Sequence, residues 1–303
     1  MVEMILSSIR SKKIFAAALL VAATFFWGVT FVTVKDAITK APVFVFLAQR
    51  FIIAFFLLLL PLPFTRRRLT RHSLVGGVVL GVLLFGGFAF QTLSLRYTSA
   101  SNTAFLTGLN VVLVPLISML FFKNKLRITV MGSALLAFAG LYLLCAGSDM
   151  SFNTGDVLGF ICAIFIAVHI IYTGNYAKNC DTYWLTTIQI GIIGLLSFVF
   201  AAFSDDPVFV YYPGIIKALI LCVLFATIFA FLVQTTMQRY ITASTTAVIF
   251  CMEPVFAAIT AYVISGERLG VRGFIGALLI LSGMIISGMP SGSKKHNQPD
   301  STE

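Results

Sequence analysis

The sequence predicts an all-α integral membrane protein, with ten transmembrane helices arranged as two inverted five-helix repeats. Three observations lead to this prediction: an apolar composition, apolar runs of membrane-spanning length, and an internal repeat. Hydrophobic residues make up 59% of the 303 residues and charged residues 11%, whereas an ordinary soluble domain carries roughly 25% charged residues. A soluble fold of this size could not bury so much apolar surface, because many of its residues must face water. The composition therefore excludes a secreted enzyme, a disordered regulator and a soluble nucleic-acid-binding protein.

Apolar runs of about 20 residues, the length that crosses a bilayer, recur along the chain. The runs are continuous rather than alternating, which is typical of helices and not of barrel strands. We predict ten spans, at residues 14–34, 42–62, 74–95, 99–122, 128–146, 157–177, 183–203, 215–238, 242–265 and 273–288. The first span is too long for the apolar core of a cleaved signal peptide, and the positive residues before it are typical of a start-transfer helix.

Lysine and arginine are divided unevenly between the loops, and this division predicts the orientation. Ten crossings place both termini on one side, where the loops and tails contain 14 of the 21 Lys and Arg residues; six lie on the other side, and Arg50 lies within a span. Positive residues collect on the cytoplasmic side. We therefore expect a multi-pass protein of the cell inner membrane with both termini cytoplasmic. The net charge of +10 arises from the same division, so it does not indicate nucleic acid as a partner.

An internal repeat relates the two halves of the chain. Residues 91–104 match residues 234–247 at eight of fourteen positions when Gln91 is aligned with Gln234. A slightly shorter offset aligns the earlier spans more weakly and pairs Arg50 with Gln189. Each copy contains five spans, and because five is odd the copies must insert in opposite orientations. This layout is typical of secondary transporters, whose binding site lies near the midplane between the halves.

The repeat divides the chain into five parts. We predict a cytoplasmic N-terminal segment at residues 1–13, a first five-helix repeat at 14–146, an extracytoplasmic linker at 147–156, a second five-helix repeat at 157–288, and a disordered cytoplasmic tail at 289–303.

Three ionisable side chains, Arg50, His169 and Glu253, fall within predicted spans. A charge at the centre of a membrane helix costs roughly 2.5–3.5 kcal/mol on insertion scales, so each side chain must face protein or water and is a candidate functional group. For Arg50 the alternative is a side chain that snorkels or pairs with carbonyl oxygens. Glu253 is a candidate to bind a cation or a proton, or else is a neutral acid bonded to a neighbouring helix. His169 is a proton relay or substrate contact on one reading and a structural histidine on the other.

Uncharged polar residues are spread through both copies of the repeat. One alternative to a binding role is that these amides and hydroxyls link helices by hydrogen bonds, which are worth ~0.6 kcal/mol on average. For Trp27 the alternative is an aromatic side chain that only packs against its neighbours. A binding pocket is favoured because some of these residues, such as Gln91 and Gln234, occupy corresponding places in the two copies. The predicted substrate-binding residues are Trp27, Arg50, Gln91, Asn102, Asn110, His169, Tyr172, Gln189 and Gln234.

Two prolines, Pro115 and Pro254, interrupt the spans at 99–122 and 242–265. A proline removes a backbone donor and kinks or breaks a helix. Broken helices at corresponding places in two repeats indicate the moving, substrate-lining elements. We therefore predict a coupling or gating role for Glu253, Pro254 and Pro115.

Sequence signatures of catalysis and of cofactor binding are missing. There is no P-loop that would bind ATP, and no HExxH, GxSxG or catalytic acid pair. The five cysteines include no CxxC pair, so neither a disulfide framework nor a metal cluster is indicated. We predict that the protein is not an enzyme and that it uses no cofactor and no metal.

Several short motifs stand out as a set. They are Trp27-Gly28-x-x-Phe31-x-x-x-Lys35, Arg50, Glu253-Pro254-Val255-Phe256 and Gly266-Glu267-Arg268-Leu269, together with Gln91-Thr92, Tyr97-Thr98-Ser99-Ala100-Ser101-Asn102, Thr107-Gly108-Leu109 and Val114-Pro115-Leu116. As a set they resemble the EamA family of the drug/metabolite transporter superfamily, over nearly all of residues 14–288. The resemblance implies ten spans, cytoplasmic termini, a central cavity lined mainly by spans 1, 3, 4, 6, 8 and 9, and alternating access. It also implies a metabolite as solute, with amino-acid export the most frequent activity and import or exchange in other members.

The two copies depart from each other in one respect that bears on this resemblance. The first copy has Asn110 where the second has Glu253. The copies are therefore not interchangeable, and a proton site would be single.

We expect a secondary transporter of small polar organic solutes that works by alternating access, and specifically an amino acid or metabolite exporter. A strongly anionic solute would require several cations in the cavity, and the spans offer only Arg50. The alternatives are an importer or exchanger of metabolites, a flippase for a lipid-linked carrier, and a non-transporting membrane sensor or scaffold. The expected partners are a small-molecule solute and membrane lipids, with protons and a second copy of the chain in a homodimer as further candidates.

Overall fold

The computed structural model of the protein describes residues 2–98, 100–122, 128–145, 153–204, 209–265 and 270–288. Within these ranges, the side chains of residues 2–10, 100–102, 122, 144–145, 261, 264–265 and 288 are outside the description. The tail predicted at 289–303, and residues 147–152 of the predicted linker, lie outside the described residues. In the remainder of the predicted linker, Asn153 caps α7 and residues 154–156 form its first turn.

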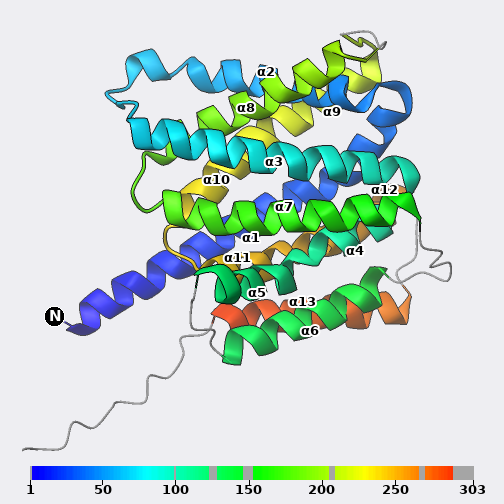
Figure 1. Cartoon of the computed structure of the whole chain (residues 1–303). Coiled ribbons are helices and arrows are strands. Elements are labelled where there is room, and N and C mark those ends of the chain that lie inside the picture. Colours follow the sequence, from blue (N-terminus) through cyan, green and yellow to red (C-terminus); the bar gives the residue numbers. More distant parts are fainter. Residues whose placement is uncertain are drawn as a thin grey trace, which may run out of the picture.

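The elements that the structure describes are all helices. In the first half they are α1 (Val2–Lys40), α2 (Val43–Leu59), the short 3₁₀ turn η1 (Leu62–Phe64), α3 (Arg71–Tyr97), α4 (Ala100–Gly108), α5 (Asn110–Phe122) and α6 (Ile128–Cys145). In the second half they are α7 (Thr154–Tyr176), α8 (Thr182–Ala202), α9 (Pro213–Leu221), the π-helix η2 (Cys222–Phe229), α10 (Ala230–Met237), α11 (Ala243–Phe250), α12 (Met252–Ser265) and α13 (Val271–Gly288). Figure 1 shows the long helices lying roughly along one axis and stacked side by side.

Eight of these helical segments are long and apolar enough to cross a membrane, and two shorter apolar helices, Ile128–Leu143 and Val271–Ser287, accompany them. The outer surface of the bundle carries large apolar side chains; Phe56 and Phe274 are each 61% exposed and Phe121 is 77% exposed. A soluble protein rarely exposes so many large apolar groups. The chain is thus a multi-pass α-helical membrane protein.

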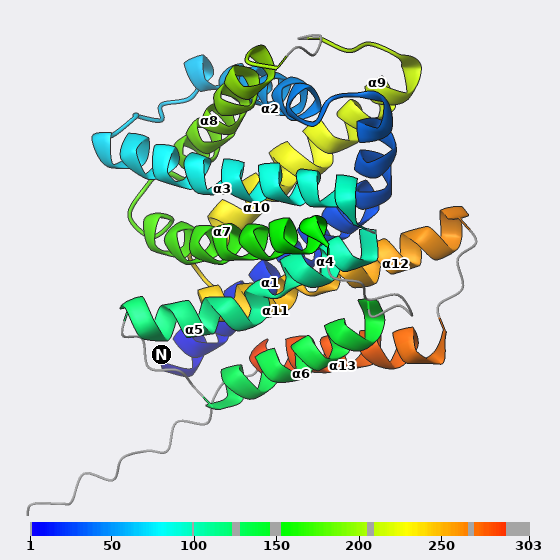
Figure 2. The same cartoon turned by 45° about the vertical axis from the view of Figure 1, so that its right-hand side comes forward.

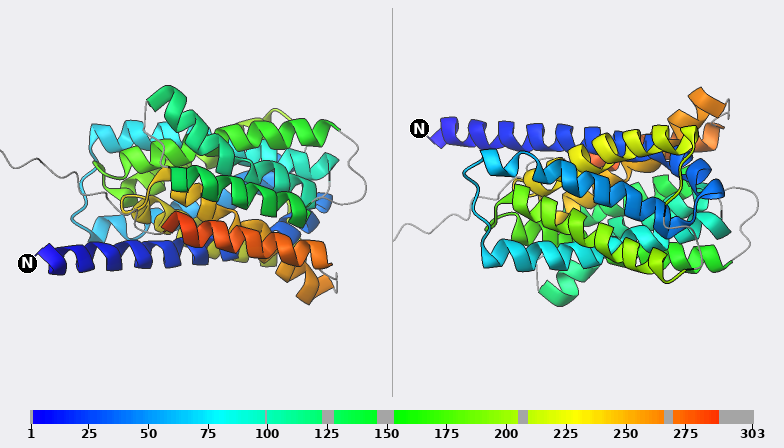
Figure 3. Two further views of the ribbon diagram at one scale, coloured as in Figure 1. Left: turned by 90° about the horizontal axis from the view of Figure 1, so that it is seen from below. Right: turned by 90° about the horizontal axis from the view of Figure 1, so that it is seen from above.

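The two ends of the bundle are distinguished by the loops that meet there. At one end the loop before α3 contacts the start of α8, where Arg67 Nη1 lies 2.6 Å from Asp181 Oδ2. At the other end α1 stops at Lys40. We refer to these as the Arg67 end and the Lys40 end. The start of α1 projects beyond the bundle at the Arg67 end (Figure 3).

Several helices begin at a residue whose side chain accepts a hydrogen bond from the first turn. Asp181 accepts from the backbone N–H groups of Tyr183 and Trp184 at the start of α8. Asn153 and Asp156 form a reciprocal capping box at the start of α7. Such caps satisfy backbone donors that have no partner inside the helix. The cap at Asn153 explains why α7 begins at Thr154, three residues before the predicted span.

Helix boundaries in the second half repeat those of the first half. The alignment that pairs Gln91 with Gln234 also pairs both ends of α6 with both ends of α13. In the first half, α4 and α5 are separated at Leu109. In the second half, α11 and α12 are separated at Cys251. The first interruption lies six residues before Pro115, which is inside α5. The second lies three residues before Pro254, in the first turn of α12.

Corresponding helices pack on each other at one face of the bundle. Figures 1 and 2 show α6 and α13 side by side below the other helices. Two glycines allow this contact: a Cβ atom at Gly140 would lie 2.5 Å from the carbonyl oxygen of Gly276, and one at Gly283 would lie 2.8 Å from that of Ser133. Small residues let membrane helices approach closely. The pair leaves the middle of the bundle to α1, α3, α4, α7, α10, α11 and α12, where the cavity lies.

Candidate functional site

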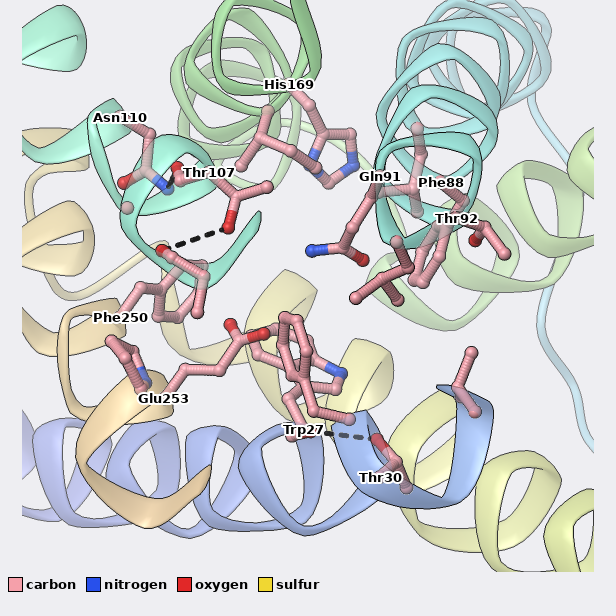
Figure 4. Close-up of a pocket in the computed structure, with 18 of the residues that line it drawn as sticks. Trp27, Thr30, Phe88, Gln91, Thr92, Thr107, Asn110, His169, Phe250 and Glu253 are labelled. Atoms are coloured by element: carbon pink, nitrogen blue, oxygen red, sulfur yellow. Dashed lines mark hydrogen bonds between the residues drawn. The ribbon is translucent and has the colours of Figure 1, made fainter. Parts of the chain in front are cut away.

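A cavity lies in the middle of the bundle, between helices from both halves (Figure 4). The space that the centres of water molecules can occupy in it is about 80 Å³. Its lining comes from α1, α2, α3, α4, α5, α7, α10, α11 and α12, and consists of Trp27, Thr30, Phe31, Val34, Arg50, Leu84, Phe88, Gln91, Thr92, Leu95, Ala104, Thr107, Gly108, Asn110, Ile166, His169, Phe231, Gln234, Phe250, Glu253 and Pro254.

The cavity extends from the middle of the bundle towards the Lys40 end. Its residues from α1 and α3 come from the halves of those helices that end at Lys40 and Tyr97. Towards the Arg67 end, the lining stops at His169 on α7 and Gln234 on α10. The two ends of the site are therefore different.

Eight of the twelve predicted site residues line this cavity: Trp27, Arg50, Gln91, Asn110, His169, Gln234, Glu253 and Pro254. Gln189 is buried next to it and contacts His169. Tyr172 stacks on Tyr176 outside the lining, and Pro115 lies within α5 away from it. The side chain of Asn102 is outside the description.

Arg50 and Trp27 both hold the π-helix η2. Arg50 Nε donates to Thr227 Oγ1 at 2.8 Å and Arg50 Nη2 donates to the carbonyl oxygen of Ala226 at 3.2 Å. Trp27 Nε1 donates to the same carbonyl oxygen at 2.8 Å. π-Helical turns occur frequently at functional sites. Here the Arg50 guanidinium from α2 and the Trp27 indole from α1 donate to the same carbonyl oxygen of the π-helix.

The Arg50 guanidinium is buried without an acidic partner among the described residues. Its carbon atom lies 5.0 Å from the ring centroids of both Phe51 and Phe88, and the residue is 3% exposed. The electron-rich faces of aromatic rings attract cations, and a buried charge needs such partners to remain ionised. Arg50 thus bonds to a carbonyl oxygen, which is the alternative that the sequence leaves open, and it does so where it lines the cavity.

Glu253 lies at the interruption between α11 and α12, and its carboxylate points into the cavity beside Trp27 (Figure 4). Gly28 lets α1 pass close to this interruption, because a Cβ atom there would lie 2.6 Å from the carbonyl oxygen of Glu253 and 2.7 Å from Cβ of Phe256. Among the described residues, none is hydrogen-bonded or ion-paired to the Glu253 carboxylate. The carboxylate is therefore available to a ligand.

Two amides in the lining have an oxygen atom without a partner among the described residues. Asn110 donates through Nδ2 to the carbonyl oxygen of Thr107 at 2.8 Å, and Gln234 donates through Nε2 to Gln238 Oε1 at 3.0 Å. Asn110 Oδ1 and Gln234 Oε1 are buried and accept no hydrogen bond. Buried polar atoms are nearly always paired, so these two oxygens are candidates to accept hydrogen bonds from a ligand.

A buried polar cluster, formed by His169, Thr173, Gln189 and Thr235, closes the cavity towards the Arg67 end. His169 Nε2 lies 3.0 Å from Gln189 Oε1 and 3.3 Å from Thr173 Oγ1. Gln189 Nε2 donates to Thr235 Oγ1 at 3.1 Å. All four residues are at most 1% exposed. The cluster ties α7, α8 and α10 together and leaves no opening at this place.

The repeat relates this buried cluster to residues that line the cavity. The two offsets that align the halves pair the four cluster residues with Thr30, Val34, Arg50 and Thr92. All four of these line the cavity. Sequence reasoning missed Thr30, Thr92, Thr173 and Thr235. The repeat itself could have indicated Thr92 and Thr235, because they directly follow Gln91 and Gln234.

The apolar bundle and its internal cavity with a polar lining are those of a membrane transporter. The model of the EamA-like transporter family matches the chain twice, at residues 14–146 and 153–289. The chain belongs to the EamA-like transporter family, and so to the superfamily that its motifs resemble.

Proteins of similar sequence are named as transporters. A protein of Archaeoglobus fulgidus named an uncharacterized transporter is 35% identical over 275 residues, which cover 91% of this chain and 86% of that protein. The uncharacterized transporter YyaM of Bacillus subtilis is 26% identical over 280 residues, covering 88% and 91%. A solved crystal structure superposes with a TM-score of 0.78 at 18% identity, over 90% of this chain and 98% of that one. That likeness concerns the fold alone.

Proposed function

We propose that the protein is a secondary transporter that moves a small polar organic solute by alternating access, with an amino acid or related metabolite as the solute and export as the direction. One observation carries the proposal. The cavity reaches towards the Lys40 end, and the buried polar cluster closes it at the Arg67 end. The repeat relates the residues of this cluster to residues that line the cavity. Two related elements, one open and one closed, are what alternating access requires.

In the alternative state the two ends exchange roles. The buried polar cluster separates, and Thr30, Arg50 and Thr92 meet in the way that His169, Gln189 and Thr235 meet here. For this to happen Arg50 must leave Ala226 and Thr227 on η2, its present acceptors. Each contact broken at one end is thus replaced by a contact at the other, which keeps the free energies of the two states similar.

We further propose the topology in which this exchange operates. The chain crosses the inner membrane ten times, as two inverted repeats at 14–146 and 157–288, with both termini and the Arg67 end cytoplasmic. The shared boundaries of α6 and α13, and the matching interruptions at Leu109 and Cys251, support the two repeats. Glu253, at the second interruption, is the candidate group for coupling transport to protons.

The size and charge of the cavity support a small solute. A space of about 80 Å³ for the centres of water molecules suits a small metabolite better than a lipid-linked carrier. The lining that the structure describes contains one carboxylate, Glu253, and one guanidinium, Arg50. A strongly anionic solute such as a sugar phosphate would require more cations than this.

Counterflow in liposomes tests the proposed function. Liposomes that contain the purified protein and unlabelled amino acids are expected to accumulate the labelled amino acid transiently from outside. Ala104→Trp fills the cavity at a residue that is 5% exposed and is expected to abolish this uptake, whereas Ile128→Trp, at a residue that is 91% exposed on the outer surface, is the matched control and should retain it. Uptake that persists in Ala104→Trp, or no uptake of any solute in a broad panel, would contradict the proposal.

A further inference from the structure

Three acceptor groups in the polar lining of the cavity have no donor among the described residues. Asn110 and Gln234 are 7% and 2% exposed, and the oxygen of each amide is without a donor while the nitrogen is already bonded. The carboxylate of Glu253 likewise has no partner among the described residues. A buried acceptor left without a donor costs about 1–3 kcal/mol. Three such groups around one cavity therefore indicate a ligand that brings N–H or O–H donors.

The charges around the cavity narrow the choice of donor. Glu253 is the one carboxylate in the described lining, and the Arg50 guanidinium is already bonded to Ala226 and Thr227. A protonated amino group carries up to three N–H donors and a positive charge, and it has no acceptor to satisfy. Trp27 stands beside Glu253 (Figure 4), and an indole ring attracts cations most strongly among aromatic side chains.

We propose that the cavity binds its solute by a protonated amino group, with Glu253 as the counter-ion and the side-chain oxygens of Asn110 and Gln234 as further acceptors. The proposal rests on the proposed function, because it assigns the chemistry of that same site. It makes the amino group, rather than a carboxylate, the part of the solute that the protein requires. Asn110 occupies the position that the repeat relates to Glu253, so the two interrupted helices contribute side-chain oxygens at equivalent positions, and only that of Glu253 belongs to an ionisable group.

Binding to matched solutes tests this requirement without transport. Purified protein in detergent is titrated with alanine, leucine and methionine, with the 2-hydroxy acid of each, and with the amine left after loss of the carboxyl group. The readouts are thermal stabilisation and the fluorescence of Trp27, with Trp27→Phe as the blank. We expect at least one amino acid and its amine to bind, and its 2-hydroxy acid to bind at least tenfold more weakly.

Three substitutions separate a ligand contact from a structural role. Glu253→Gln keeps the shape of the side chain and removes its charge, and it should weaken amine binding about 10- to 100-fold. Asn110→Leu removes the unpaired oxygen and should weaken amine binding about two- to tenfold, and it also removes the hydrogen bond to the Thr107 carbonyl oxygen. Glu253→Asp keeps the charge and should retain the preference for the amine over the hydroxy acid.

Several outcomes would overturn the amino-group proposal. These are hydroxy acids that bind as tightly as amino acids, no binding of any amine, or a preference for amines that survives Glu253→Gln. Counterflow of solutes without an amino group would leave the transporter standing and remove this specificity. Amine binding that depends on Glu253 in a protein that shows no counterflow of any solute would instead remove the proposed function and leave the binding site.

Discussion

At the scale of single residues, Arg50 has the most demanding environment in the described structure. Its charge is buried and is held by one hydroxyl, one carbonyl group and two ring faces, all from neutral residues. Arginine suits this place because its planar guanidinium donates in several fixed directions and remains charged. Lysine could reach only one acceptor at a time and would not stack on the rings in the same way.

Arg50→Lys is expected to destabilise the protein by about 1.5–3 kcal/mol, because it removes one charge-assisted hydrogen bond and the stacking between rings. Thr227→Val removes the hydroxyl acceptor alone and should destabilise it by about 0.6–1.7 kcal/mol. Thermal unfolding of the purified protein in detergent measures both changes.

The matched control is Arg272→Lys, since Arg272 lies on the surface over the Tyr142 ring at 5.6 Å. That variant should change stability by less than about 0.5 kcal/mol. Equal effects of the two arginine substitutions would show that the contacts of Arg50 with η2 contribute nothing particular to stability.

The sequence predicts the charged members of the site better than the hydroxyl members. Arg50, His169 and Glu253 are conspicuous because a charge within an apolar span is expensive, and all three line the cavity. A threonine within a span is common and gives no such signal, so Thr173 and Thr227 could not be distinguished from the others. Their roles depend on which helix lies opposite, which is a property of the tertiary structure.

At the scale of helices, glycines decide how closely the elements around the cavity approach. Gly28 is the point at which α1 meets the interruption before α12, with the Glu253 carbonyl oxygen where a Cβ atom would be. The backbone of α12 cannot yield as a flexible side chain could. A methyl group at this place would push α1 and α12 apart and would displace Trp27 and Glu253 from the cavity wall.

Gly28→Ala is therefore expected to destabilise the protein by about 1–3 kcal/mol, as overpacking does in well-packed interiors, and to lower counterflow. Gly132→Ala is the control, because a Cβ atom at Gly132 on α6 would meet no atom within 4 Å. It should leave stability and counterflow unchanged. If Gly28→Ala and Gly132→Ala behave alike, the close approach of α1 to α12 does not position the site.

Helix boundaries could be predicted only in part from the sequence. The predicted apolar runs coincide with the eight long apolar segments and the two shorter apolar helices that the structure describes, since a span must be apolar over its whole length. The interruption at Leu109 lies away from the proline that was expected to cause it, and the π-helix between α9 and α10 has no signature in its apolar sequence. Both features depend on packing against α1, α2 and α6 rather than on local propensity.

At the scale of the whole molecule, the repeat is the feature that connects sequence to mechanism. The matching segments at 91–104 and 234–247 predict equivalent helices. The starts of α4 and α11 are equivalent, at Ala100 and Ala243, whereas α10 ends at Met237, three residues before the position equivalent to the end of α3 at Tyr97. What the sequence could not indicate is which of the two related segments lines the cavity. Thr92 lines it, while Thr235 is bonded to Gln189 in the buried cluster.

The accessibility of the paired positions Thr92 and Thr235 tests the central claim most directly. A cysteine is placed at each position in turn, in a Cys180→Ala background, because Cys180 lies in a loop and its thiol could react as well. Burial raises the pKa of this thiol, but the thiol still becomes more reactive as the pH rises. A membrane-impermeant maleimide is then applied from either side of sealed vesicles. We expect Thr92→Cys, in the cavity lining, to react only from the side of the Lys40 end and Thr235→Cys, in the buried cluster, only from the side of the Arg67 end, with modification of one cysteine preventing modification of the other in a double variant. Reaction of both positions from the same side, or simultaneous reaction of both, would contradict a cavity that opens alternately at its two ends.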